Sequence, residues 1–133
     1  MRAFHIEIVT PDGSKFCGEV ESLLVRTDDG DVEILAGHAD YLAAVGTGRV
    51  RLIVDGKERF ASVNGGFLSV KGKEVRLCAI TFEFADQIDL KRAEAAKEKA
   101  EAALQSAKDE RDERIAKAKL ARAASRINVA NMK

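Results

Sequence analysis

Several features are scarce or missing in this chain of 133 residues. It has one proline, no tryptophan and only 5% aromatic residues, so a surface that stacks nucleic-acid bases is not expected. No apolar run approaches the roughly 18 residues of a membrane-spanning helix, and no N-terminal basic segment precedes an apolar one. The sequence therefore predicts neither secretion nor membrane insertion, and any membrane association should come through partners.

Cysteine and histidine are also rare, with only Cys17, Cys78, His5 and His38. Two cysteines are compatible with a disulfide, but two buried thiols in the strands of a cytosolic protein are the favoured interpretation. Because none of the four side chains has a neighbour at metal-ligand spacing, no metal site is predicted.

The net charge is zero, but it is unevenly distributed. Residues 1–85 carry 10 Lys and Arg against 13 Asp and Glu, whereas residues 86–133 carry 12 against 9. After Glu113 there are six basic residues and no acidic one. This is too little charge for a dedicated nucleic-acid surface, but it favours an acidic protein partner or a phosphate ligand.

Residues 1–85 show the alternating pattern of short β-strands, as in Phe4, Ile6 and Ile8. Turn signals recur between the strands, at Pro11-Asp12-Gly13, Asp28-Asp29-Gly30, Asp55-Gly56, Asn64-Gly65-Gly66 and Lys71-Gly72-Lys73. Strands at this spacing predict an all-β sandwich, or flattened barrel, of about ten short strands over residues 1–85.

From Asp86 onward there is neither glycine nor proline, and alanine becomes abundant. Two alanine-rich stripes at helical spacing run over 93–107 and 116–130, and Asp89 and Asp109 are suitable N-caps. We therefore predict a C-terminal arm over 86–133, made of two antiparallel helices joined near 106–110.

The arm should be held together weakly, because each buried alanine contributes one methyl group, about 0.8 kcal/mol. The linking segment also contains no helix breaker, so the same residues are able to join both helices into one rod. Our hypothesis is that the arm has two accessible states, a folded hairpin and an extended helix.

The order of signals resembles the epsilon subunit of the bacterial F-type ATP synthase along essentially the whole chain. Three positions depart from the family pattern. Ala36 and Asp40 stand where the family usually has prolines, and Glu33 stands where it commonly has a glycine. These departures should make the loop over 30–48 less rigid. The resemblance rests on Val9-Thr10-Pro11-Asp12-Gly13, Ile34-Leu35-Ala36-Gly37-His38, Gly65-Gly66-Phe67-Leu68-Ser69-Val70, Ala85-Asp86-Gln87-Ile88-Asp89 and the Ala/Arg-rich last helix.

This resemblance implies a non-catalytic subunit of the central stalk, peripheral on the cytoplasmic face of the bacterial membrane. The sandwich would bind the gamma subunit and the ring of c subunits. The arm would extend toward the alpha and beta subunits and inhibit ATP hydrolysis, in a complex that makes ATP from a transmembrane ion gradient.

Ile88-Asp89-Leu90-Lys91-Arg92-Ala93 matches a motif of epsilon subunits that bind ATP. In an antiparallel hairpin, Arg122 and Arg126 would lie beside Arg92, so that three guanidinium groups meet the phosphates. Asp89 and Glu83 would accept hydrogen bonds from the base or ribose. Bound ATP, a regulatory ligand, would clamp the hairpin shut. The opposing interpretation is that Asp89 is only an N-cap and the arginines are solvated or contact other subunits.

Two other classes of function fit the sequence less well. The first is a stand-alone β-barrel module with a helical tail that binds nucleic acid or protein, and it is disfavoured by the zero net charge and the few aromatics. The second is a small enzyme, and it is disfavoured because the chain has no phosphate-binding Gly-rich loop, nucleophile elbow or metal-ligand cluster.

Overall fold

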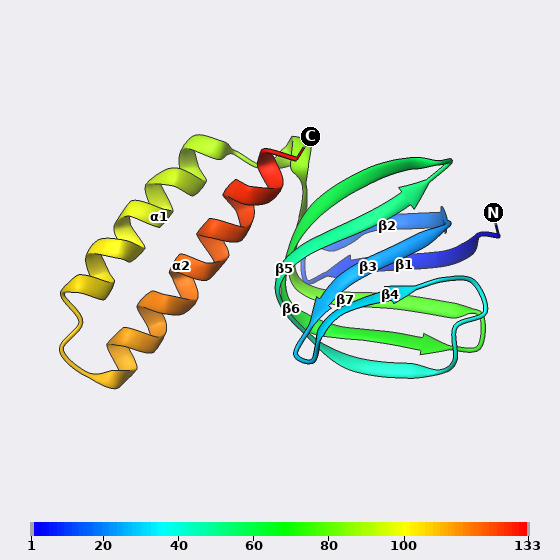
Figure 1. The fold of residues 1–133 in the computed structure, drawn as a ribbon, viewed down its shortest axis with the longest axis horizontal. Coiled ribbons are helices and arrows are strands. Elements are labelled where there is room, and N and C mark those ends of the chain that lie inside the picture. The colour runs from blue at the N-terminus through cyan, green and yellow to red at the C-terminus, as the bar shows by residue number, and fades with distance from the viewer. Residues whose placement is uncertain (1, 133) are drawn as a thin grey trace.

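The computed structural model describes residues 2–132 and contains a folded sheet followed by two helices (Figure 1). The seven strands lie in the order β2-β1-β7-β6-β5-β3-β4, and of these pairs only β1 and β7 are parallel. The strands are β1 (Phe4–Thr10), β2 (Gly13–Val20), β3 (Ser22–Thr27), β4 (Gly30–Ile34), β5 (Tyr41–Val54), β6 (Lys57–Lys71) and β7 (Glu74–Phe84). The sheet bends over on itself, which confirms the predicted sandwich.

The number of strands differs from the predicted ten or so because β5 and β6 are long, with 14 and 15 residues. The expected turn at Asn64-Gly65-Gly66 does not interrupt β6. Instead Gly65 and Gly66 have φ of 68° and 106°, and β6 bends there without ending. A Cβ at Gly66 would overlap the carbonyl oxygen of Cys78 on β7, so this bend requires glycine.

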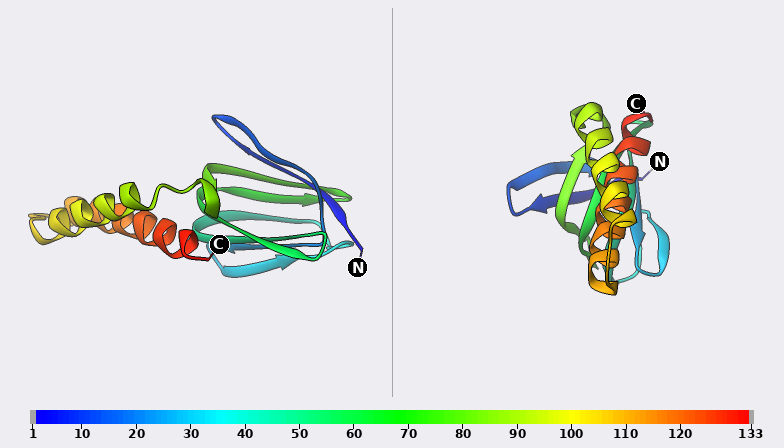
Figure 2. Two further views of the ribbon diagram at one scale, coloured as in Figure 1. Left: turned by 90° about the horizontal axis from the view of Figure 1, so that it is seen from above. Right: turned by 90° about the vertical axis from the view of Figure 1, so that its left-hand side faces the viewer.

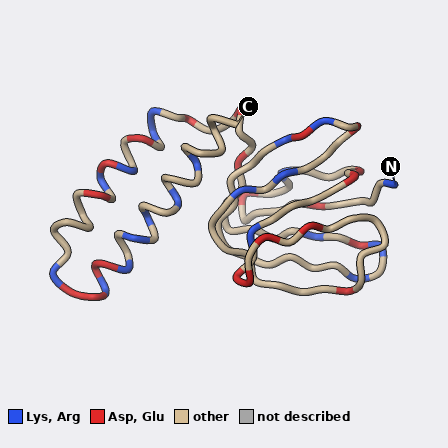
Figure 3. Tube along the Cα trace, in the orientation of Figure 1, with Lys and Arg blue, Asp and Glu red and all other residues tan. Residues whose placement is uncertain are grey.

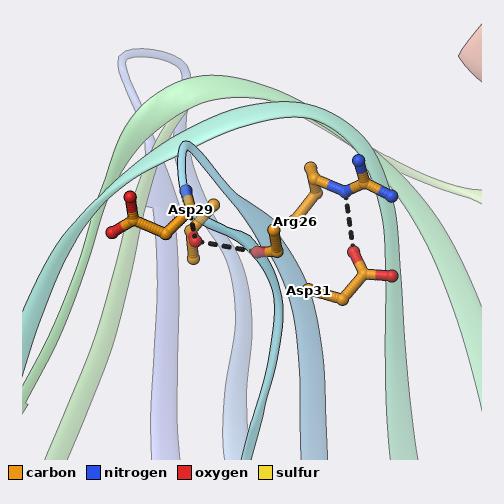
Figure 4. Close-up of polar contacts among 5 residues, drawn as sticks. Arg26, Asp29 and Asp31 are labelled. Atoms are coloured by element: carbon orange, nitrogen blue, oxygen red, sulfur yellow. Dashed lines mark hydrogen bonds and ion pairs between the residues drawn. The ribbon is translucent and has the colours of Figure 1, made fainter.

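The turn between β3 and β4 forms at the predicted Asp28-Asp29-Gly30 (Figure 4). The hydroxyl of Thr27 donates to the carbonyl of Gly30 at 2.8 Å and accepts from the N–H of Asp29 at 3.1 Å. Arg26 Nε lies 2.7 Å from Asp31 Oδ1 across the hairpin. Local hydrogen bonds therefore fix this tight connection.

The core lies between the two layers. It contains the residues that face inward at every second position along the strands, among them Ile6, Ile8, Leu68 and Leu77, all fully buried. The prediction of two buried thiols is wrong. Cys17 is exposed and Cys78 is half-buried, and both are free, because both occupy outward-facing positions on their strands.

The arm begins after a short 3-10 turn, η1 (Ala85–Gln87), and consists of α1 (Leu90–Gln105) and α2 (Glu110–Ala130). Asp89 Oδ1 accepts the N–H of Arg92 at 3.1 Å, and Asp109 Oδ1 accepts the N–H of Asp112 at 2.8 Å. Both predicted N-caps are thus present. The two helices pack side by side as an antiparallel hairpin, as predicted.

Apart from Val129, the residues of α1 and α2 that are buried are all alanines. We call the buried set Ala93, Ala100, Ala116 and Ala123 the alanine seam. Ala96 and Ala103, also in the predicted stripe, are exposed. The seam therefore buries even fewer methyl groups than the sequence pattern indicates, which weakens the attraction between the helices.

The hairpin is attached to the sandwich mainly through the end of α2, while its tip extends away from the sheet (Figure 2). Val129 and Ala130 are buried against Ala85 and Ile88, with Phe60 packed at the margin. The hydroxyl groups of Ser62 and Ser125 are 3.3 Å apart. Within the described residues, neither helix is long and apolar enough to cross a membrane.

Candidate functional site

A pocket of about 430 Å³ lies where the arm meets the sandwich, and we call it the arm cleft. Residues from the end of β7, from η1 and its following turn, and from both helices contribute to it. It is lined by Glu83, Gln87, Ile88, Asp89, Arg92, Ala93, Ala96 and Arg126. Six of the seven predicted site residues therefore come together, although they are spread over more than forty positions in the sequence.

One ion pair spans the arm cleft. Arg126 Nε of α2 lies 2.9 Å from Glu83 Oε1 of β7, and their side chains are 30% and 39% exposed. Glu83 was expected to accept hydrogen bonds from a ligand, but here it accepts one from Arg126. In this state the pair joins the arm to the sandwich.

Asp89 also has a structural role, as the N-cap of α1. Its Oδ1 is occupied by the N–H of Arg92, while the Arg92 side chain is exposed and lines the cleft. Ile88 is buried and Ala93 is 4% exposed, so both supply apolar wall. The N-terminal turn of α1, the Arg92 guanidinium and an apolar wall thus lie together, an arrangement suited to an anionic ligand with a flat apolar part.

The remaining predicted residue, Arg122, lines a neighbouring pocket of about 290 Å³ between α1 and α2, which we call the seam cleft. The seam cleft shares Ala96 and Arg126 with the arm cleft, so the two adjoin. Its lining comprises Ala96, Lys99, Ala100, Ala103, Lys119, Arg122, Ala123 and Arg126. Four of these eight side chains are cationic and none is acidic.

Gln87, Lys99 and Lys119 are lining residues that the sequence reasoning missed. Lys99 follows Arg92 by seven residues, or two helical turns, and therefore lies on the same side of α1. Lys119 precedes Arg122 by three residues and Arg126 by seven. Helical spacing from the predicted arginines was the signal available for both lysines, whereas nothing in the sequence placed Gln87.

The charge along α2 is segregated, whereas acidic and basic residues are mixed along α1 (Figure 3). Acidic residues gather at the tip, where α2 begins with Glu110, Asp112 and Glu113, and the rest of α2 is basic. Of the cationic side chains that line the two clefts, Arg126 alone forms an ion pair among residues 2–132. Residues 2–132 hold no group of three or more His, Cys, Asp or Glu side chains suited to a metal ion. The seam cleft, which has no acidic lining residue, therefore attracts anions, whereas the arm cleft has two acidic and two basic lining residues.

A second surface lies on the outer face of the sandwich and shares no residue with the lining of the arm cleft. Phe67 of β6 is paired with Ala44 of β5 and with Cys78 of β7. Leu42 lies two residues before Ala44 on β5, and Ile80 lies two residues after Cys78 on β7. Each is therefore on the same face of the sheet as Phe67. Leu42, Phe67 and Ile80 are 72%, 47% and 59% exposed. We call these five residues the apolar stripe, and such a continuous exposed patch is typical of an interaction surface.

Two family models match the sequence, and together they span almost all of it. Residues 3–85 match the ATP synthase delta/epsilon chain beta-sandwich domain, and residues 86–131 match the long alpha-helix domain of the same chain. The ATP synthase epsilon chain of Bacillus velezensis is 42% identical over 130 residues, 98% of each chain. That of Bacillus pumilus is 39% identical, again over 98% of each chain.

Two solved structures share the fold. A chain of the Euglena gracilis mitochondrial ATP synthase, solved with OSCP, F1 and c-ring, matches with a TM-score of 0.83 at 22% identity, over 98% of this chain and 82% of that one. A chain of the Tetrahymena thermophila central stalk and c-ring matches with a TM-score of 0.65 at 12% identity, over 98% and 96%. The sandwich with its helical hairpin therefore recurs in proteins of distant sequence.

Proposed function

Because the chain belongs to the ATP synthase delta/epsilon chain family, we propose that it acts as a non-catalytic regulatory subunit in the central stalk of an F-type ATP synthase. The observation that carries this proposal is the correspondence of both parts, sandwich and arm, over 98% of the Bacillus velezensis epsilon chain. The subunit connects the rotor to the catalytic head while an ion gradient drives ATP synthesis. A stand-alone binding module would not need this full-length correspondence.

The proposed partners are the gamma subunit and the ring of c subunits for the sandwich, and the alpha and beta subunits for the arm. The apolar stripe supports the first, because Leu42, Phe67 and Ile80 would leave water on binding a stalk subunit. The basic residues of α2 support binding of the arm to the beta subunits, because they would pair with acidic loops on those subunits. Through these partners the chain is peripheral on the cytoplasmic face of the membrane.

The arm is the proposed brake on ATP hydrolysis. In the folded hairpin its basic face borders the two clefts, so reaching the catalytic subunits requires α2 to leave α1 and the sandwich. The contacts to be broken are weak: an alanine seam, one ion pair that is partly exposed, and a small apolar cluster at the end of α2. An equilibrium between folded and extended arms is therefore accessible to a ligand or partner.

ATP is the proposed regulatory ligand, and the residues present fit it. Arg92, Arg122 and Arg126 would hold the phosphates, with Arg126 exchanging its bond to Glu83 for one to phosphate. Glu83 and Asp89 would accept hydrogen bonds from the base or ribose, and Ile88 and Ala93 supply apolar contact. Because both helices contribute, ATP stabilises the folded arm by mass action and keeps the brake off.

ATP binding is tested by calorimetric titration of the isolated chain. Arg92→Ala should weaken binding by about tenfold or more, since it removes a hydrogen bond to a charged group. Arg111→Ala is the matched control, because Arg111 is exposed near the arm tip and lines neither cleft, so it should bind like the parent chain. Equal affinity of Arg92→Ala and the parent chain would exclude this site.

The regulatory role is tested by adding the chain to an ATP synthase head that lacks this subunit. We expect the rate of ATP hydrolysis to fall, and a chain that ends at residue 87 to bind without lowering the rate. Failure of the full chain to bind the complex, or to change its hydrolysis rate, would contradict the proposed function.

A further inference from the structure

A separate pocket of about 400 Å³ lies at the N-terminal end of the sandwich, and we call it the edge pocket. It is formed by the start of β1, the loop after β4 and the turn between β6 and β7. Figure 1 places the N-terminus at the end of the sandwich away from the arm. The edge pocket shares no lining residue with the arm cleft or the seam cleft.

The inner wall of the edge pocket is apolar. Phe4, Val70 and Val75 belong to the sandwich core and are 9%, 3% and 6% exposed. Leu35 and Ala36 complete the wall, and Leu35 is 48% exposed. A leucine left half in water beside a concave apolar surface is covered when an apolar group enters the pocket.

The rim of the edge pocket is cationic. The guanidinium group of Arg2 lies over Gly37, with Nη2 3.8 Å from the place a Cβ would take there. Lys73 approaches from the β6–β7 turn. Neither side chain takes part in an ion pair or hydrogen bond with any of the residues 2–132.

The single carboxylate of the lining, Glu19, does not neutralise these two cations. Its Oε1 lies 3.7 Å from Nδ1 of His5. The Nδ1–H of His38 donates to the carbonyl of Ala39 at 2.6 Å, which fixes that ring at the rim. Two unpaired cations thus stand over an apolar wall, a combination that favours a ligand with one anionic and one apolar end.

We propose that the edge pocket binds an amphipathic anion, a single phosphate or carboxylate head on an alkyl or acyl chain. The anionic head of the ligand lies between Arg2 and Lys73, and its alkyl or acyl part lies against Phe4, Leu35 and Val75. The pocket volume is in the usual range for small-molecule sites, about 300–1,000 Å³. This binding goes beyond the proposed function, because it uses neither the arm nor the apolar stripe. Such a ligand is either a free amphiphile or a membrane lipid.

The test uses the full chain and calorimetric titration with decyl phosphate below its micelle concentration, and with inorganic phosphate. Lys73→Glu and Arg2→Glu should each weaken decyl phosphate binding by about tenfold or more, the loss of one charge-assisted contact. Ala36→Phe should weaken it by filling the pocket. Lys57→Glu, a change at another exposed lysine, the first residue of β6, is the matched control and should leave the affinity unchanged.

Saturable decyl phosphate binding that is at least tenfold tighter than phosphate binding supports the site. Co-sedimentation with phosphatidylglycerol vesicles, lost in Lys73→Glu, then identifies a lipid, and its absence identifies a free amphiphile. Equal binding of phosphate and decyl phosphate, no saturable binding, or unchanged binding by both charge variants would overturn the proposal. Because Arg2 and Lys73 are both exposed, these two variants should fold normally, which circular dichroism checks.

Discussion

The ion pair between Glu83 and Arg126 gives the sharpest prediction about the arm. It is the single ion pair between arm and sandwich within residues 2–132, with Nε and Oε1 2.9 Å apart. We predict that Glu83→Gln and Arg126→Gln each shift the arm toward the undocked state, and that the double variant adds little to either single one.

The magnitude follows from the exposure of the two side chains, 30% and 39%. A fully exposed pair contributes at most about 1 kcal/mol, and this partly covered pair should lie near that value after screening by solvent. A coupling free energy of about 1 kcal/mol changes the ratio of docked to undocked arms by roughly fivefold.

The assay is a double-mutant cycle read by fluorescence energy transfer. Dyes at Lys57 on the sandwich and Lys108 at the arm tip, both exposed, report docking in a background where Cys17 and Cys78 are replaced. Lys117→Gln is the control, because it breaks a pair with Glu113 inside α2. A coupling energy of zero, with docking unchanged in both single variants, would refute the role of this pair.

Three further predictions concern stability. Gly66→Ala should destabilise the sandwich by several kcal/mol in urea unfolding, since the new Cβ overlaps Cys78, whereas Gly56→Ala has open space and should cost about 1 kcal/mol for its positive φ. Asp109→Ala should cost about 1 kcal/mol and speed hydrogen exchange in the first turn of α2, and unchanged exchange would argue against the cap. Val129→Ala should cost about 1–2 kcal/mol, seen as a lower thermal midpoint of the arm, because this side chain is fully buried at the junction.

The sequence predicted the architecture well where local signals are strong. Alternation and turn residues indicated the strands, and the change to helical period at Asp86, with Asp89 and Asp109 as caps, indicated the hairpin. The strand count was too high because Gly65 and Gly66 have the composition of a turn but form a bend inside β6. Only the carbonyl of Cys78, far away in sequence, shows why glycine is needed there.

The grouping of the candidate site residues was predicted better than the contacts among them. The predicted antiparallel hairpin brings Arg126 and Arg92 into the lining of one cleft, but Arg122, which was expected to join them, lines the adjoining seam cleft. The bond between Arg126 and Glu83 was not foreseen, because it depends on how α2 docks on the sandwich. Local pattern does not encode that docking, which rests on tertiary contacts such as those of Val129 and Phe60. The exposure of Cys17 was missed for a related reason, since residues 16–18 show too little apolar contrast to reveal which face points outward.

The central claim, that the arm switches between two states under the control of ATP, is tested by one distance. Dyes at Glu94 and Asn128, both exposed, lie on adjacent helices in the hairpin, whose axes are about 8–10 Å apart in such packing. A continuous helix would separate them by about 50 Å at 1.5 Å per residue. We predict the short distance in the isolated chain and in the assembled complex with ATP, and the long one in the complex without ATP. The same short distance under all three conditions would contradict the account.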